Sequence, residues 1–425
     1  MSVPAIEVRI WGQQVGAVAP DPKAGCYAFE YAPSWQRKRI ELAPLTMPVD
    51  TVSAIYLFPS LPEPSFKRLP GLLADALPDD FGNALIDAWM ARRGIGKDAI
   101  STLDRLAYMG RRGMGALEFK PAQGSHSESA EPLQMKLLVE AARSVMRGDL
   151  TDDSHAQAAL ASIIRVGTSA GGARAKAVVA WNPNTDELRS GQFDVAPGFE
   201  HWLLKFDGVG KDLELGTGAH YGRIEYAYHR MARAAGIAME DCRLLQENGR
   251  AHFMTRRFDR DGNAKHHVQT LCAMQHVDYK QRGTHAYEQL FLVAMQLRLG
   301  DDALDEAFRR MAFNVMARNC DDHTKNFGFR MKQGGEWQLT PAYDVTHAYN
   351  PKGEWTYQHL MSVNGKFDGI DRTDLLYVAE RFGVRRPKDL LAQVRAAVAG
   401  WAGFANAAGL AAVDAEGVAG DHRLL

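Results

Sequence analysis

Hydrophobic and polar positions alternate in the first part of the chain, as they do in an antiparallel sheet. Alternating segments at Ile6–Ile10 and at 28–31 are separated by Gly and Pro, which favour turns. Apolar residues then recur at helical spacing over 81–89, and Gly94 marks the end of that pattern. The pattern therefore predicts strands followed by a helix, with a second short helix over 101–109.

The pattern changes again after residue 132. It predicts a helix near 133–146, strands at 176–181 and 201–206, a helix over 224–235, strands at 243–245 and 252–258, helices at 287–298 and 305–318, and strands at 327–331 and 337–341. The Ala-rich stretch 396–413 predicts a packed helix, and the tail from Asp414 is expected to fray. The strands within 176–206 resemble those of the small nucleotide-binding lobe of a kinase.

Prolines bracket a short segment of small and polar residues at 121–132, which is typical of a linker. The expected division is an N-terminal subdomain at 1–120, this linker, a nucleotide-binding portion at 133–258 and a helical C-terminal lobe at 259–425. The predicted class is α+β: a two-lobed, protein-kinase-like fold with a β-rich N-terminal subdomain and a mainly helical C-terminal lobe.

Composition places the chain among ordinary globular proteins. It has 425 residues, 46% of them hydrophobic and 24% charged, and its formal net charge is -1. That balance gives no overall basic field to recruit nucleic acid. The four cysteines form no C-x-x-C pair, and no secretory signal or membrane span is predicted, so a cytoplasmic protein is expected.

Asp321 and Asn326 lie in the run N-C-D-D-H-T-K-N, at the spacing of a kinase catalytic loop. Two strand-like segments follow, and they are expected to deliver Asp344 to the same site. In a kinase the loop Asp accepts a hydroxyl proton, while the Asn and the later Asp hold Mg²⁺, which prefers such oxygen ligands. An isolated match of this kind is more often a solvated loop, so the surrounding pattern carries the hypothesis.

Two further segments could bind phosphate. The run V-G-T-S-A-G-G-A-R-A-K has small residues that would let backbone N–H groups approach phosphate oxygens, although most such turns bind nothing. Lys205 lies within an apolar strand and could reach phosphates, or it could protect an exposed sheet edge. His323 is expected to brace the loop, and Cys320 is interpreted as a small buried residue rather than a nucleophile.

The motifs together resemble the HipA-type serine/threonine kinases, the toxins of bacterial toxin–antitoxin pairs. The segments that carry the resemblance, in family order, are L-P-D-D-F-G-N-A-L-I-D, V-G-T-S-A-G-G-A-R-A-K, R-R-F-D-R, V-Q-T-L-C, N-C-D-D-H-T-K-N-F-G and L-T-P-A-Y-D-V. Several motifs in order are far more specific than any one of them. The later acid stands in D-V-T rather than the D-F-G of protein kinases, which puts gating by a Phe at that position in doubt.

The resemblance implies roles for individual residues. Asp321 would be the general base, Asn326 and Asp344 the Mg²⁺ ligands, and Ser169 the site of an inactivating autophosphorylation. The remaining residues implied to bind ATP are Ala170, Gly171, Gly172, Ala173, Lys205, Phe258 at the adenine hinge, and His323 within the loop.

The resemblance also implies partners and a role. The expected activity is phosphorylation of a cellular protein, such as an aminoacyl-tRNA synthetase, which arrests growth. A small helix-turn-helix antitoxin similar to HipB would restrain the kinase and provide an indirect link to DNA. Two alternatives stay open: a small-molecule or lipid kinase, and an inactive kinase-like corepressor that only binds the antitoxin.

Overall fold

The computed structural model describes residues 3–49, 54–123, 133–147, 163, 164, 166, 174–209 and 220–425. The chain divides into two compact units that interleave along the sequence. The first comprises Met1–Gly210, Asp259–Asp278 and Met331–Gly335, and the second comprises Lys211–Phe258, Tyr279–Arg330 and Glu336–Leu425. Each unit is described below by itself.

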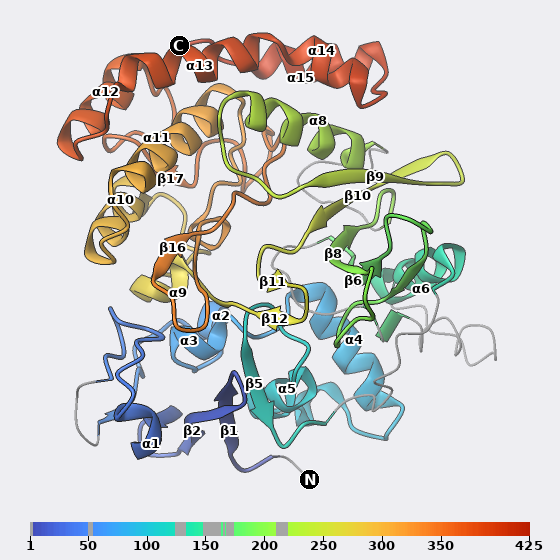
Figure 1. The fold of residues 1–425 in the computed structure, drawn as a ribbon, viewed down its shortest axis with the longest axis vertical. Helices are drawn as coiled ribbons and strands as arrows, with labels where there is room; N and C mark the ends of the chain where they lie inside the picture. The colour runs from blue at the N-terminus through green and yellow to red at the C-terminus, as the bar shows by residue number, and fades with distance from the viewer. Residues whose placement is uncertain are drawn as a thin grey trace. The chain divides into compact units, whose positions relative to one another are not determined.

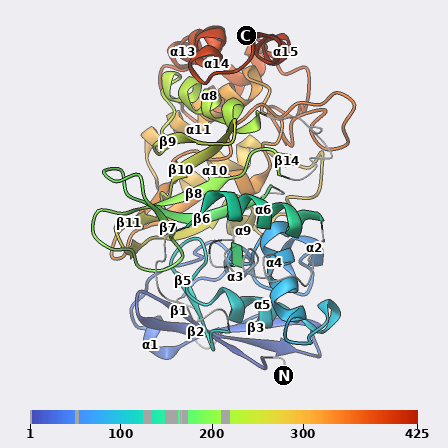
Figure 2. The ribbon, with the colours of Figure 1, turned by 90° about the vertical axis from the view of Figure 1, so that its right-hand side faces the viewer.

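The first unit begins with a five-stranded antiparallel sheet of order β4-β3-β2-β1-β5. Its strands are β1 (Ile6–Ile10), β2 (Gln13–Asp21), β3 (Cys26–Tyr31), β4 (Ile55–Tyr56) and β5 (Leu117–Lys120). Alternate side chains of β1 are buried, as expected of a sheet with one covered face. Helix α5 (Thr102–Met109) packs against β1 and β5 (Figure 2).

A second set of strands in the first unit carries Lys205, which the sequence predicts to bind phosphate. In the antiparallel order β7-β6-β8, β6 (Lys176–Trp181) lies between β7 (Leu188–Ser190) and β8 (Glu200–Lys205). The other elements of this unit are α1 (Pro33–Gln36), α2 (Glu63–Phe66), α3 (Gly71–Ala74), α4 (Asp80–Ala91), η1 (Lys97–Ala99), α6 (Met135–Arg147), β11 (Arg260–Asp261), β12 (Ala264–Lys265), β13 (His267–Thr270) and α9 (Leu271–Gln275).

The second unit is mainly helical. Its helices are α8 (Tyr221–Ala234), α10 (Tyr287–Gln296), α11 (Asp301–Met316), η2 (Thr324–Asn326), α12 (Arg372–Arg381), α13 (Pro387–Ala399), α14 (Trp401–Ala407) and α15 (Ala412–Asp421). In Figure 1 the C-terminal helices lie beside α8 and α11, and α13 packs against both. Its strands are β9 (Cys242–Glu247), β10 (Arg250–Arg256), β14 (His285–Ala286), β15 (Gly328–Met331), β16 (Trp337–Leu339) and β17 (Met361–Ser362).

The predicted class is confirmed: the N-terminal region is β-rich and the C-terminal region is helical. The tail prediction was wrong, because residues from Ala412 form helix α15 rather than a frayed end. The single helix expected over 396–413 is also divided. The breaks fall at Gly400, which separates α13 from α14, and at Gly409, whose positive φ of 72° suits a residue without a Cβ.

The observed division differs from the expected ranges in more than one segment, since Lys211–Phe258, expected in the nucleotide-binding portion, groups with the helical unit. The segment after Asp259 groups with the first unit and not with the helical lobe. Asp259 is fully buried, and its carboxylate accepts hydrogen bonds from the Gly115 backbone N–H and from Arg260, both at 2.7 Å. His267 contacts the Leu42 carbonyl oxygen at 2.9 Å. These long-range contacts hold residues 259–278 against the N-terminal region.

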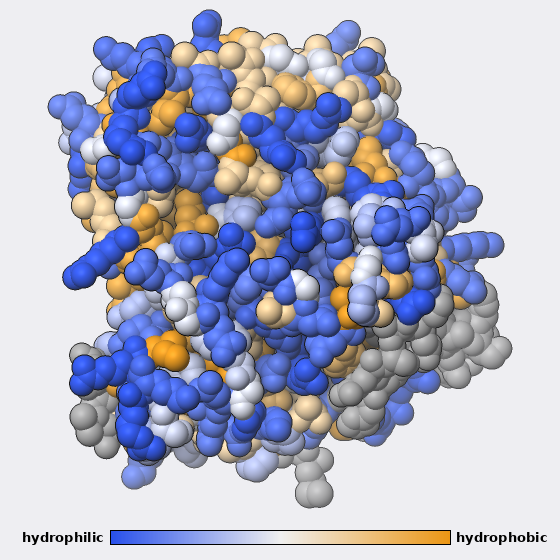
Figure 3. Space-filling model, in the orientation of Figure 1, coloured by the Kyte–Doolittle hydropathy of each residue, from blue (hydrophilic) through white to orange (hydrophobic). Residues whose placement is uncertain are grey.

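Hydrophilic residues predominate on the face of the molecule drawn in Figure 3, with hydrophobic ones scattered among them. Among the described residues, no helix has both the length and the apolar character needed to cross a bilayer.

Candidate active site

The segment that carries Asp321 follows α11 directly. Helix α11 ends at Met316, and the next residues turn through Arg318, which has a positive φ of 54°. Cys320 then donates its backbone N–H to the Ala348 carbonyl oxygen at 2.9 Å, and the Ala348 N–H bonds to the Arg318 carbonyl at 3.2 Å. These bonds fasten the start of the loop to a segment almost thirty residues further along the chain.

Asn326 closes the loop onto Asp321. Its side-chain Nδ2 donates to the Asp321 carbonyl oxygen at 2.7 Å, and the intervening 324–326 form the 3₁₀ turn η2. Because this bond uses the amide nitrogen, the amide oxygen is the atom that remains for a metal ion. The five-residue spacing read from the sequence therefore corresponds to a closed local structure.

The Asp321 carboxylate lies among groups of both charges. It accepts a 2.7 Å hydrogen bond from the Trp355 indole, and His323 Nε2 lies 3.8 Å away. Burial raises the pKa of Asp321, His323 and Trp355 oppose the rise, and the carboxylates of Asp344 and Asp322 add to it. The side chain is nevertheless 40% exposed, so solvent limits the effect and substrate can reach the carboxylate.

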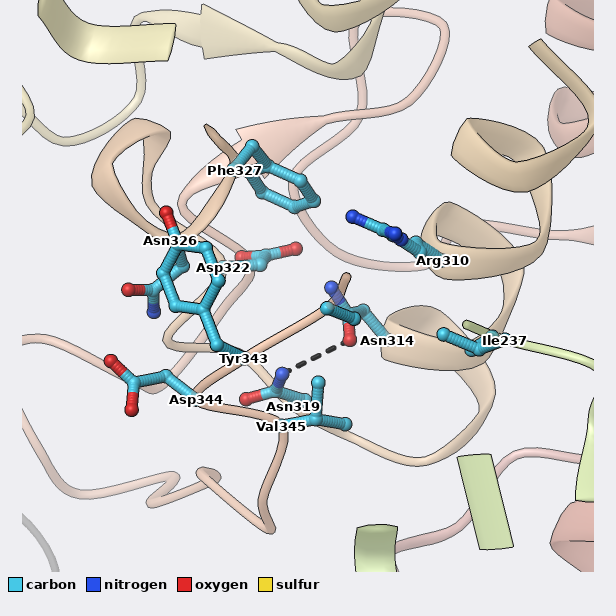
Figure 4. A pocket seen from close by; sticks show the side chains of 11 residues that line it. Ile237, Arg310, Asn314, Asn319, Asp322, Asn326, Phe327, Tyr343, Asp344 and Val345 are labelled. Atoms are coloured by element: carbon cyan, nitrogen blue, oxygen red, sulfur yellow. Dashed lines mark hydrogen bonds between the residues drawn. The ribbon is translucent and has the colours of Figure 1, made fainter. Parts of the chain in front are cut away.

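Asp344 reaches the same site through a hairpin. Strands β15 and β16 pair, and the chain then leads through Tyr343 to Asp344, whose φ is 52°. The Tyr343 hydroxyl donates to the Lys325 carbonyl oxygen at 2.8 Å, which joins the hairpin to the loop. In Figure 4 the side chains of Asn326 and Asp344 lie on the same side of Tyr343.

Asn326 and Asp344 line one small cavity of about 10 Å³, roughly the space of a single water molecule (Figure 4). The other residues that line it are Ile237, Arg310, Asn314, Asn319, Asp322, Phe327, Ala342, Tyr343 and Val345. One amide oxygen and one carboxylate fit Mg²⁺, which takes few protein ligands and completes its shell with waters and phosphate oxygens. Among the described residues, no group of three or more His, Cys, Asp or Glu forms a metal cluster.

Asp322 differs completely from its neighbour Asp321. Its side chain is fully buried and accepts hydrogen bonds from the Tyr287 hydroxyl at 2.7 Å and the Leu360 N–H at 2.8 Å, and it contacts His359 Nδ1 at 2.8 Å. Burial alone would lower the pKa of His359, but the Asp322 charge raises it to about 10. Asp322 and His359 therefore form a buried pair of an aspartate and a protonated histidine. The contacts of Asp322 hold the loop in place.

Cys320 belongs to this buried cluster. Its Sγ lies 3.8 Å from His359 Nε2, and His359 Nδ1 contacts the Asp322 carboxylate. The imidazole of His359 therefore contacts both the thiol and the carboxylate. A catalytic thiol must meet its substrate, whereas Cys320 and His359 are 0% and 1% exposed. The structure therefore places Cys320 as a packing residue, in agreement with the interpretation of the sequence.

His323 lies between two aromatic side chains. Its ring centroid is 5.3 Å from that of Tyr279 and 6.3 Å from that of Trp355. The same Tyr279 ring lies 4.7 Å from the Lys325 Nζ. These contacts suit a residue that braces the loop.

Phe258 is the last residue before the chain passes into the first unit. Its ring stacks on Tyr343 with centroids 5.5 Å apart, and its carbonyl oxygen accepts a 3.0 Å bond from Arg330. The backbone carbonyl expected at an adenine hinge is thus already hydrogen-bonded to a side chain of the hairpin. Whether Phe258 binds adenine stays a prediction.

The remaining predicted residues belong to the first unit or lie outside the described residues. Lys205 is the last residue of β8 and belongs to the first unit, whereas Asp321, His323, Asn326, Asp344 and Phe258 all belong to the second. Residues 167–173 of the glycine-rich run lie outside the described residues, and with them Ser169, Ala170, Gly171, Gly172 and Ala173.

Sequence reasoning missed the residues that hold the loop in place. Trp355 and His359 lie in an irregular stretch with no periodicity, and nothing local connects them to the loop. Asp322 could have been recognised in the sequence as a candidate because it follows Asp321 directly. Spacing alone, however, could not distinguish a buried structural residue from a catalytic one.

Comparison with known proteins identifies the family. The family model described as the HipA-like C-terminal domain matches residues 168–401, and that of the HipA N-terminal domain matches residues 6–120. The chain belongs to the HipA family. The C-terminal match contains all of the loop and hairpin described above, and the N-terminal match contains the five-stranded sheet.

One solved structure agrees with that assignment at the level of fold. The HipA chain in a toxin–antitoxin complex of HipA, HipB and operator DNA from Shewanella oneidensis MR-1 is similar, with a TM-score of 0.67. The match covers 98% of this chain and 94% of that one at 19% identity. A weaker similarity, with a TM-score of 0.36 and 12% identity over 52% of this chain and 84% of the other, relates it to the Helicobacter pylori proinflammatory kinase CtkA.

Proposed function

We propose that this HipA-family chain is an ATP-dependent serine/threonine protein kinase and the toxin of a toxin–antitoxin module. The observation that carries the proposal is the closed loop in which Asn326 bonds to the Asp321 carbonyl while Asp344 lines the same cavity. An exposed carboxylate beside two oxygen ligands for Mg²⁺ is the minimum equipment for phosphoryl transfer.

In this reaction Asp321 accepts the proton of a serine or threonine hydroxyl. The hydroxyl oxygen bonds to the γ-phosphorus of ATP as the bond to the bridging oxygen breaks, and ADP leaves. Asn326 and Asp344 would hold Mg²⁺, which offsets the negative charge of the phosphates. Trp355 and His323 orient the Asp321 carboxylate toward the acceptor, and Lys205 supplies a cation for the phosphates.

Regulation follows from Ser169 in the glycine-rich run. Autophosphorylation there would add a dianion to a segment that must approach the phosphates of ATP. Repulsion between the two would expel the segment and switch the enzyme off. The unmodified serine would accompany the ATP-bound state, with Phe258 at the adenine hinge.

The expected partners come from the similar protein. The Shewanella HipA is described in complex with HipB and operator DNA, so a HipB-like helix-turn-helix antitoxin is the proposed partner here, and DNA is reached only through it. The proposed substrate is a cytoplasmic protein, for which an aminoacyl-tRNA synthetase is the first to test.

Labelled ATP incubated with the purified chain and a cell lysate tests the activity. Label on Ser169 and on a lysate protein, absent with Asp321→Ala, supports a protein kinase. Label on a small acceptor with no protein labelled would instead favour a small-molecule or lipid kinase. No label at all, together with equal toxicity of the wild type and Asp321→Ala, would leave the inactive corepressor.

Phosphoproteomics after brief induction identifies the substrate. Phosphorylation sites whose occupancy rises on induction of the wild-type chain, and not of Asp321→Ala, are direct or early targets. If a tRNA synthetase is the substrate, its phosphorylated form should dominate within minutes, before general growth arrest changes other sites.

A further inference from the structure

A series of buried hydrogen bonds in the second unit leads from Asp322 to the small cavity beside the proposed metal ligands. The Tyr287 hydroxyl donates to Asp322 Oδ2 at 2.7 Å, and Asn314 Nδ2 donates to the Tyr287 oxygen at 2.9 Å. Asn319 Nδ2 then donates to Asn314 Oδ1 at 3.0 Å, along the dashed line in Figure 4. Asn314 and Asn319 both line the cavity, so the series ends there.

The Asp322 carboxylate fixes the direction of every bond in this series. A carboxylate can only accept, so the Tyr287 hydroxyl gives its proton to Asp322 and must itself accept from Asn314. The Asn314 amide then has its nitrogen occupied and offers its oxygen, which accepts from the nitrogen of Asn319. The group left at the end of the series is therefore Asn319 Oδ1, an acceptor.

Asn319 Oδ1 needs a donor, because it is buried. Among the described residues, none donates a hydrogen bond to this oxygen, and Asn319 is only 3% exposed. A buried acceptor without a partner costs about 1–3 kcal/mol. In Figure 4 the oxygen points away from Asn314 and toward the side on which Asp344 lies. A donor inside the cavity would remove this cost.

The groups on the metal side of the cavity are acceptors as well. Asn326 uses its amide nitrogen within the loop, which leaves its oxygen, and Asp344 contributes a carboxylate. Arg310 also lines the cavity, but its guanidinium donates to Glu306 Oε1 and to the Thr340 carbonyl oxygen. A water molecule donates two hydrogen bonds, and a polar cavity of about 10 Å³ has room for one such molecule.

We propose that the cavity holds one water molecule, which donates to Asn319 Oδ1 and to the Asp344 carboxylate, and that Asn319 is thereby a positioning residue for the Mg²⁺ site. The inference rests on the proposed function, which supplies the metal ion. Asn319 is buried whereas Asp344 is half-buried, so the water holds the carboxylate on its buried side and leaves the other side for the ion. Hydrogen-bond partners orient a metal-binding carboxylate, and their loss typically costs about 10–100-fold in metal affinity.

Binding of Mn²⁺ to the full-length chain in the presence of ADP tests this inference, because electron paramagnetic resonance measures the free Mn²⁺. Asn319→Leu removes the oxygen with little change in side-chain size. We expect it to weaken Mn²⁺ binding about tenfold and to leave calorimetric ADP binding in EDTA unchanged. Thr340→Val is the matched control, since the Thr340 hydroxyl is also buried without a partner among the described residues but does not line the cavity. It should change neither affinity.

Equal Mn²⁺ affinities for Asn319→Leu and Thr340→Val would overturn the inference while the proposed function stands. Equal weakening of Mn²⁺ binding and of metal-free ADP binding by Asn319→Leu would also overturn it, because Asn319 would then act on the fold and not on the metal site. A wild-type chain that binds no Mn²⁺ in the presence of ADP would overturn the proposed function, and the inference with it.

A crystal structure of the wild-type chain decides the question if Asn319→Leu folds poorly. We expect one water molecule about 2.5–3.0 Å from both Asn319 Oδ1 and a carboxylate oxygen of Asp344. An empty cavity would overturn the inference. A cation about 2.1 Å from the Asn319 oxygen would overturn it too, because Asn319 would then be a metal ligand itself.

Discussion

At the scale of single residues, two adjacent aspartates have opposite environments. Asp321 is 40% exposed and bonded to Trp355, whereas Asp322 is buried among Tyr287, His359 and the Leu360 N–H. The same type of side chain thus serves two purposes: one carboxylate is exposed, as the proposed general base must be, and the other holds the loop. Substitutions at the two positions should therefore have different consequences.

We expect Asp321→Asn to lower the rate of phosphoryl transfer at least about a hundredfold, because the proposed general base is lost. Its free energy of unfolding should change by no more than about 0.5 kcal/mol. Asp322→Asn should instead lower that free energy by about 3–5 kcal/mol, because His359 then keeps an unpaired buried charge. Urea unfolding and a kinase assay on both variants measure the two effects, and similar profiles for the two would contradict this assignment.

The His359 pair predicts a pH dependence. Its pKa of about 10 in the folded protein lies above 6.5, the ordinary value expected in the unfolded chain. Between those values the native state keeps a proton that the unfolded state has released, so stability falls as pH rises. The stabilisation is complete below pH 6.5 and is lost as pH approaches about 10.

His359→Gln is the matched variant, since its amide can still donate to Asp322 but does not titrate. The difference in unfolding free energy between wild type and His359→Gln should be largest near pH 6.5 and should shrink toward pH 10. Urea titrations across that range measure it. A difference that stays constant with pH would mean that His359 is neutral in the folded protein.

Asp344 allows a test of the metal site without backbone strain. Its φ of 52° is left-handed, and Asn tolerates that region better than most residues. Asp344→Asn should therefore fold normally but need at least about tenfold more Mg²⁺ for half-maximal activity. Asp389→Asn, an exposed change in the first turn of α13, is the control. Identical Mg²⁺ titrations for both variants would exclude Asp344 as a ligand.

The residues that could be predicted are those with a fixed spacing along the chain. The proximity of Asp321, Asn326 and Asp344 could be predicted from local sequence, because the loop and the hairpin that position them are local structures, while their catalytic and metal-binding roles stay predictions. Trp355 and His359 could not be predicted, since each reaches the loop only through tertiary packing. The buried ion pair between Lys176 and Asp79 likewise joins segments that no sequence period connects.

At the scale of elements, two helical glycines differ in the space that surrounds them. A Cβ on Gly222 of α8 would lie 2.0 Å from the Ala251 carbonyl oxygen of β10, whereas a Cβ on Gly417 of α15 would meet nothing within 4 Å. The glycine in α8 therefore allows the helix to approach the strand closely. The glycine in α15 only weakens its helix.

Gly222→Ala should lower the free energy of unfolding by about 2–4 kcal/mol, because the backbone of α8 must move away from β10. Gly417→Ala should raise it by about 0.5–1 kcal/mol through helix propensity. Thermal unfolding of the two variants and the wild type measures whether each substitution lowers or raises the free energy of unfolding. A stabilising Gly222→Ala would mean that α8 does not pack closely against β10.

Many of the elements were predicted from the sequence, but β2, β5 and α12 were not among the predicted segments. Strands β1 and β6 coincide with the predicted segments because their alternation or apolar run is strong. The short parallel pair β14 and β17 was missed, since each strand has two residues and exists only through its partner. Helix α15 was missed because its sequence consists mainly of Ala, Gly and Val and buries only one residue, Val418.

At the scale of the whole molecule, segments of the two units alternate along the sequence. A sequence division at 258/259 separates α8 from the helices that it packs against. Tyr228 of α8 is fully buried, its hydroxyl donates to the Ala317 carbonyl oxygen at 2.6 Å, and its ring centroid lies 5.2 Å from that of Trp401. A boundary drawn at residue 258 therefore does not coincide with the boundary of the helical unit, because α8 is part of the core of that unit.

This arrangement predicts how fragments behave. A fragment of residues 259–425 lacks α8 and should expose the apolar surface that Tyr228 covers, so it should melt without a cooperative transition and bind a hydrophobic dye. A fragment of residues 220–425 retains α8 and should melt cooperatively, while its Tyr228→Ala variant should lose about 3–5 kcal/mol of stability. Circular dichroism and dye binding distinguish the two fragments. Cooperative melting of 259–425 would show instead that the helical lobe folds without α8, as the sequence division implied.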